Sequence, residues 1–112
     1  MTEEIFKELP FAVTACDIDG KIIYMNEKSS TTFQKYGGES LIGKSLYDCH
    51  NPNSSDKIME IIQTGEANSY TILKNGVKKL IYQSPWYKAG QIAGLVEISL
   101  IIPEDMAHFV RK

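Results

Sequence analysis

Cys49 and His50 are adjacent, and they combine the two most reactive residue types in the chain. A neutral imidazole can ligate haem iron or titrate near neutral pH, and a thiolate is favoured close to a helix N-terminus. Neighbouring residues of an extended chain point apart, however, and no third group that could orient the histidine is evident. The pair does not predict a catalytic dyad. A structural role for both residues is favoured over ligation.

Glu97 and Ser99 are candidates for a polar site inside the protein. They alternate with Val96 and Ile98, so the two pairs fall on opposite faces of an expected strand. If Glu97 faces inward, it brings a carboxylate into the interior, where that group needs a partner or a ligand. If Val96 faces inward instead, Glu97 is exposed. Alternation alone leaves both orientations open.

Tyr82 and Trp86 are the most prominent of several aromatic residues in the second half of the chain. They fall on one face of an expected strand, together with Ser84. An aromatic face of this kind can stack against a flat ligand or pack against a second protein. Packing within the core is the alternative.

The segment Gly38–Ser45 formally fits the phosphate-binding pattern GxxxxGK[ST]. That loop normally follows a buried parallel strand and opens a long helix. Here the segment follows an expected helix, and no helix-forming run comes after Ser45. We therefore interpret the match as chance.

The elements that must position these residues can be read from turn signals and apolar spacing. Asn26 is a helix N-cap candidate, and Asn75-Gly76 is typical of a tight hairpin turn. Ile58, Ile61 and Ile62 follow the spacing of one helix face. Strands are expected at 11–18, 21–25, 67–74, 77–87 and 91–102, helices at 27–35 and 56–63, and a short tail, helical or irregular, at 104–112. This order predicts an α+β fold in which helices pack on one face of a five-stranded antiparallel sheet.

Length and composition exclude several classes of protein. The chain has 112 residues, which suits one domain. Its net charge is -2 without a basic stripe, so no nucleic-acid partner is expected. No apolar run approaches a membrane span, and the acidic N-terminus lacks a secretory signal, which predicts a cytoplasmic protein. The two cysteines, Cys16 and Cys49, are far apart and predict neither a disulfide nor a metal site.

Five segments carry a pattern that covers nearly the whole chain. They are Leu9-Pro10-Phe11-Ala12-Val13, the hairpin from Asp17-Ile18-Asp19-Gly20 to Tyr24-Met25-Asn26, Leu41-Ile42-Gly43-Lys44-Ser45-Leu46, Cys49-His50-Asn51-Pro52, and the series Gly76, Ser84-Pro85, Gly90 and Gly94. In this order they resemble the PAS family, and most of all its small bacterial members with Cys-His-x-Pro before the long helix. The resemblance implies a sensory or interaction module and not an enzyme.

The resemblance leaves the ligand open, since PAS domains bind haem, flavins or small metabolites, or bind nothing and act as dimer platforms. The Asn-Cys-Arg segment of flavin-binding light sensors is missing. The last strand ends on Leu100-Ile101-Ile102-Pro103, where many members have an Asp-Ile-Thr that leads to an output helix. The resemblance thus allows haem or a flavin as cofactor, but no specific motif in the sequence indicates either one.

The sequence as a whole predicts one PAS domain over residues 1–112, with its core at about 9–102. It would bind a small ligand between the long helix and the sheet and signal without a covalent output, through a homodimer or a partner signalling protein. The alternative is a ligand-free interaction domain. The expected pocket-lining residues are Cys49, His50, Ile58, Ile62, Tyr82, Trp86, Glu97 and Ser99.

Overall fold

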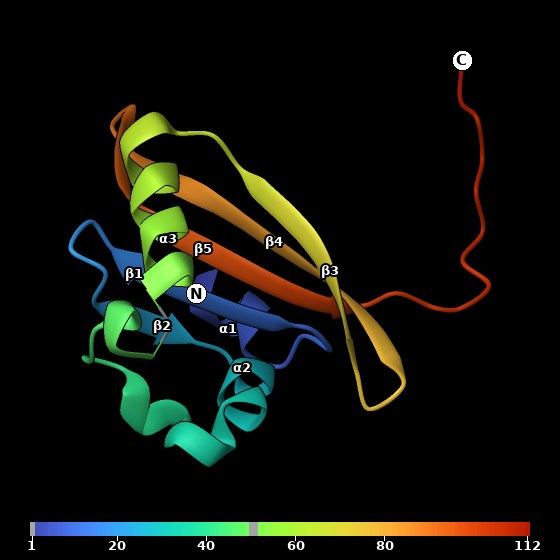
Figure 1. Cartoon of the computed structure of the whole chain (residues 1–112), viewed down its shortest axis with the longest axis horizontal. Coiled ribbons are helices and arrows are strands. Elements are labelled where there is room, and N and C mark those ends of the chain that lie inside the picture. Colours follow the sequence, from blue (N-terminus) through green and yellow to red (C-terminus); the bar gives the residue numbers. More distant parts are fainter. Residues whose placement is uncertain (1, 50–51) are drawn as a thin grey trace.

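The computed structural model describes residues 2–49 and 52–112, with an element order of helix, two strands, two helices and three strands (Figure 1). The helices and strands are α1 (Thr2–Lys7), β1 (Ala12–Asp17), β2 (Ile22–Met25), α2 (Glu27–Thr32), α3 (Pro52–Thr64), β3 (Asn68–Lys74), β4 (Val77–Lys88) and β5 (Gln91–Ile101). Three short 3₁₀ turns, Gln34–Tyr36, Gly38–Leu41 and Leu46–Cys49, connect α2 to α3.

The strands form one antiparallel sheet in the order β2-β1-β5-β4-β3. The last strand in sequence therefore lies at the centre of the sheet, between β1 and β4. The predicted fold class is confirmed: α2 and α3 pack on one face of the sheet, which we call the inner face. The short helix α1 lies against the opposite, outer face, where Phe6 adjoins Val13 and Val96.

The turns behave as their residues predict. Asn75 and Gly76 both have positive φ angles, 53° and 77°, as a type I′ turn requires. Asn26 is the N-cap of α2, and its side-chain oxygen accepts the backbone N–H of Ser29 at 2.9 Å.

Two helix boundaries differ from those expected. Helix α2 ends at Thr32 and is followed by a 3₁₀ turn. The hydroxyls of Thr31 and Thr32 bond back to carbonyls one turn earlier, and these β-branched residues are weak helix formers. The long helix begins at Pro52, where proline is well suited to a first turn. The tail at 102–112 forms neither helix nor strand.

The core lies between α3 and the middle of the inner face. Ile58 and Ile61 are 0% and 1% exposed, as their spacing predicts, and they belong to one cluster with Cys16 and Leu95. Leu95 fixes the orientation of β5, because residues two apart on a strand share a face.

Candidate functional site

The open question about the last strand is answered by its burial. Leu95 lies in the core, so Glu97 and Ser99 also point to the inner face, and both line a cavity there. Val96 and Ile98 point to the outer face. Glu97 is partly buried, with its position set by β1 on one side and β4 on the other.

Glu97 belongs to a row of polar residues that crosses the inner face. The register pairs Asn68 with Gln83, Gln83 with Glu97, and Glu97 with Thr14. The Asn68 amide donates to Gln83 Oε1 at 3.0 Å, and the Thr14 hydroxyl is hydrogen-bonded to that of Ser29 in α2. Gln83, Thr14 and Ser29 are buried, at 4%, 6% and 0% exposure. A polar row at this depth restricts the orientation of each member, since a buried polar group without a partner is costly.

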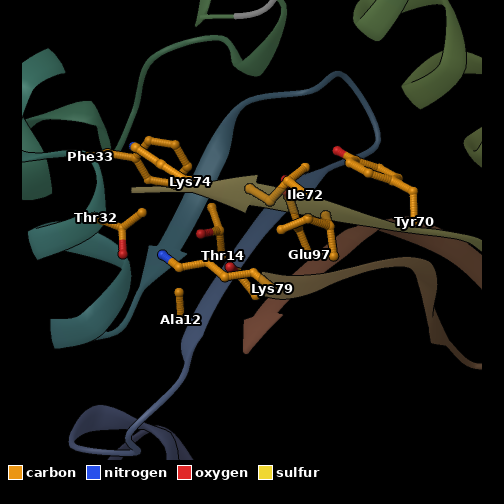
Figure 2. Close-up of a pocket in the computed structure, with 11 residues that line it drawn as sticks. Ala12, Thr14, Thr32, Phe33, Tyr70, Ile72, Lys74, Lys79 and Glu97 are labelled. Atoms are coloured by element: carbon orange, nitrogen blue, oxygen red, sulfur yellow. The ribbon is translucent and has the colours of Figure 1, made fainter. Parts of the chain in front are cut away.

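A hollow opens beside this row, between α2 and the sheet (Figure 2). It has two lobes, of about 190 Å³ and 290 Å³, which share Thr14, Phe33, Lys74 and Glu97. The first lobe extends over the inner face along β3 to β5, and the second extends toward the apolar core. The complete lining of the first lobe is Ala12, Thr14, Thr32, Phe33, Tyr70, Ile72, Lys74, Lys79, Ile81, Glu97 and Ser99.

Charges of both signs meet in the hollow. The Glu97 carboxylate comes from the central strand β5, whereas Lys74 comes from the edge strand β3 and Lys79 from its neighbour β4. The phenol of Tyr70 has a raised pKa, because partial burial disfavours its ionised form and the Glu97 charge opposes it further. The aromatic ring of Phe33 closes the α2 side (Figure 2). The site therefore offers an acceptor, two cations and an aromatic surface to a small molecule.

The hollow does not lie where the sequence placed it. The expected pocket was beside the long helix, but neither lobe is lined by a described residue of α3. Ile58 is fully buried in the core and Ile62 packs against that core, so these two residues fill the space beside α3. The prediction that both line the pocket is corrected accordingly.

Tyr82 and Trp86 also require a correction. The register pairs Tyr82 with Ile98, which points outward, and places both aromatic residues on the face opposite Glu97. The indole Nε1 of Trp86 donates to the carbonyl of Cys16 at 2.9 Å. The shared strand face was predicted correctly, but these side chains cannot line an inner pocket that also contains Glu97.

Cys49 and His50 remain untested as pocket residues. His50 lies outside the described residues, and so does the side chain of Cys49. Among the residues that are described, no three or more His, Cys, Asp or Glu side chains are grouped as a metal site.

Sequence reasoning missed the residues that come from α2 and from the β3–β4 hairpin. Phe33 was expected inside a helix, and nothing in the sequence was a reason to place Lys74 or Lys79 in a pocket. The signal was present in the hairpin: the turn at Asn75-Gly76 fixes the register, which places residues 70, 72 and 74 on one face with 79 and 81. The hairpin alone does not show that this face is the inner one, because that assignment requires the orientation of β5.

Comparison with known proteins identifies the family. The family described as the PAS fold matches residues 6–64, which is more than half of the chain. The chain belongs to the PAS fold family. No protein with a curated description matches it.

Solved structures share the fold at low sequence identity. The VqmA dimer of Vibrio cholerae has a TM-score of 0.71 at 18% identity, with 92% of this chain and 52% of that chain covered. The PAS domain of a protein from Colwellia psychrerythraea has a TM-score of 0.66 at 21% identity, covering 90% and 93%. The Vibrio cholerae receptor Aer2, described as a dual PAS-haem oxygen sensor, has a TM-score of 0.65 at 15% identity, covering 83% and 95%.

This PAS domain spans only about half of VqmA, which has also been solved bound to the ligand DPO and, separately, in a complex with ligand and DNA. At these identities the likeness extends to the fold. In the described part of the chain, no helix is both long and apolar enough to cross a bilayer.

Proposed function

We propose that this PAS domain is a sensory module that binds a small ligand in the hollow between α2 and the inner face of the sheet. The observation that carries the proposal is the placement of Glu97. A partly buried carboxylate on the central strand lines both lobes, together with Thr14 and Phe33. Such a group gives a bound molecule a directed polar contact beside the apolar surface of Phe33, Ile72 and Ile81.

The size of the hollow restricts the ligand. Lobes of about 190 Å³ and 290 Å³ are each below the range of about 300–1,000 Å³ that is typical of drug-sized ligands. A compact metabolite fits this space better than haem or a flavin. The VqmA structure with DPO supports the binding of a small ligand, because VqmA shares the fold and binds one.

The output would be non-covalent, and the domain would not act as an enzyme. Ligand binding shifts a conformational equilibrium only through different contacts in the two states. Here the row from Glu97 through Thr14 to Ser29 connects the hollow to α2, and thereby to Asn26 and α1 on the outer face. The proposed readout is a homodimer or a partner signalling protein in the cytoplasm. We also assign the domain to the Cys-His-x-Pro subset, with residues 1–112 as one unit and no nucleic-acid partner.

Native mass spectrometry of the purified protein tests the proposal. We expect an added mass of small-molecule size that disappears on denaturation, together with no visible absorption from haem or flavin. The variant Glu97→Gln should lose most of the added mass. The control Glu60→Gln removes an exposed carboxylate on α3 and should retain it.

A ligand-free interaction domain is the second candidate, and the small volume of both lobes favours it. It predicts identical native and denatured masses for every variant. It also predicts that filling the hollow, for example with Ser99→Leu, leaves partner binding unchanged.

A further inference from the structure

The outer face carries an apolar groove, with an acidic cleft beside it. The groove has a volume of about 480 Å³ and is lined by Glu3, Phe6, Phe11, Val13, Ala15, Ile23, Tyr24, Val96 and Ile98. The cleft has a volume of about 580 Å³, and its charged lining residues are Glu3, Glu4, Glu27 and Glu39 against the single base Lys7. Glu3 and Tyr24 line both, so the two depressions are continuous.

Residues 106–112 of the C-terminal tail have the complementary character. Met106, Phe109 and Val110 are 62%, 69% and 83% exposed, although all three are large and apolar. The Arg111 guanidinium lies 5.3 Å from the centre of the Phe109 ring, which is a cation–π contact. The tail therefore presents an apolar ring and a cation as one unit, and Lys112 follows it.

The tail does not cover its own groove. It leaves the sheet at the end of β5 beside the β3–β4 hairpin, where Ile102, Pro103 and Met106 lie next to Leu73 and Val77. From there it extends away from the rest of the domain (Figure 1). Ten residues, 103–112, reach about 33 Å when extended, which is enough to cross a groove on a neighbouring molecule.

We propose that the tail of one copy docks on the outer face of a second copy, with Phe109 in the apolar groove and Arg111 against Glu3 at the edge of the acidic cleft. The exchange is reciprocal in a twofold dimer, so each copy gives one tail and receives one. Charge complementarity selects this occupant, since the cation follows the ring on the tail just as the acidic cleft adjoins the groove. This contact rests on the homodimer of the proposed function and specifies how it forms.

Charge-reversal variants of the full chain test the docking. We expect sedimentation velocity to show that Arg111→Glu and Glu3→Lys each weaken the dimer by at least about fivefold, as the loss of one surface ion pair per tail implies. Mixing the two variants in equal amounts should restore wild-type affinity, because every tail then meets a groove of opposite charge. The matched controls Lys88→Glu and Glu60→Lys change exposed charges elsewhere and should have no effect.

The outcomes separate the possibilities. Restoration on mixing supports docking between copies. Docking within one chain would give no rescue on mixing and would overturn the proposal. If neither charge substitution weakens the dimer, and Phe109→Ser on the exposed tail does not weaken it either, tail docking is overturned while the homodimer stands. A wild-type chain that stays monomeric at all concentrations overturns both.

Discussion

Each face of the sheet departs in one strip from the polarity that is usual for it. The inner face, which a two-layer domain normally fills with apolar side chains, carries Gln83, Glu97 and Thr14 in one row. The outer face, which normally meets water, carries Val96 and Ile98 in an apolar groove. The inner row is suited to a polar ligand, and the outer groove is suited to apolar protein surface.

The largest expected effect comes from Gly94, in the central strand β5. A Cβ at this position would lie 1.9 Å from the Cys16 carbonyl oxygen and 2.6 Å from the Trp86 indole nitrogen. Gly94→Ala should therefore lower the free energy of unfolding by about 3 kcal/mol or more, as overpacking against backbone does. Chemical denaturation measures the change.

Gly76→Ala is the matched control for Gly94→Ala. It has a positive φ of 77° but open space around the added Cβ, so it should cost only about 1 kcal/mol. Equal losses at the two glycines would contradict a steric origin.

The next largest loss in the free energy of unfolding is expected at the buried hydroxyl pair on the inner face. Thr14→Val leaves the Ser29 hydroxyl, which is fully buried, without this partner, and should cost about 1–2 kcal/mol. The double variant with Ser29→Ala should be more stable than the sum of the single changes predicts. A double-mutant cycle by thermal denaturation checks this, and strict additivity would show that the two hydroxyls are independent.

Alkaline pH should weaken the core modestly through Cys16. Burial raises the pKa of its thiol above the ordinary value of 9.0, with Asp17 and Glu97 adding to the effect and a hydrogen bond to the Leu95 backbone opposing it. Stability is therefore intact below pH 9.0 and falls as the pH rises toward the folded pKa, because the unfolded chain ionises first. Unfolding curves at pH 8 and 9.7 measure the loss.

The variant Cys16→Ala provides the comparison for that titration. It should be less stable at pH 8 but lose less on going to pH 9.7. Cys49 is present in both proteins, so its contribution cancels. An identical loss in both proteins would assign the alkaline effect to other groups.

The smallest stability effect is expected on the outer face. Ile23 is 45% exposed, so Ile23→Lys should change the free energy of unfolding by no more than about 0.5 kcal/mol. It should nevertheless weaken self-association, because it places a charge in the apolar groove. Sedimentation and denaturation of the same sample measure self-association and stability together. A loss of stability without a loss of self-association would contradict a binding role for the groove.

Local signals were sufficient for most of the fold. The hairpin at Asn75-Gly76, the cap at Asn26 and the helix face of Ile58 and Ile61 were predictable, because turn chemistry and apolar spacing act within a few residues. The orientation of Glu97 was not predictable, since both faces of β5 contain apolar residues and only packing against α3 decides between them. The position of the hollow depends on contacts among distant segments, and Ile58 and Ile62 fill the space that the sequence had assigned to it.

The carboxamide of Asn26 determines where the domain can be shortened. Its Nδ2 donates to the carbonyls of Phe6 and Phe11, both at 2.9 Å, while its oxygen accepts from Val13 at 3.0 Å and from Ser29. A fragment that starts at Leu9 would lose the Phe6 carbonyl and leave a buried amide hydrogen without its acceptor. Expression fragments of this domain should therefore begin upstream of Phe6, which makes the first helix part of the folding unit.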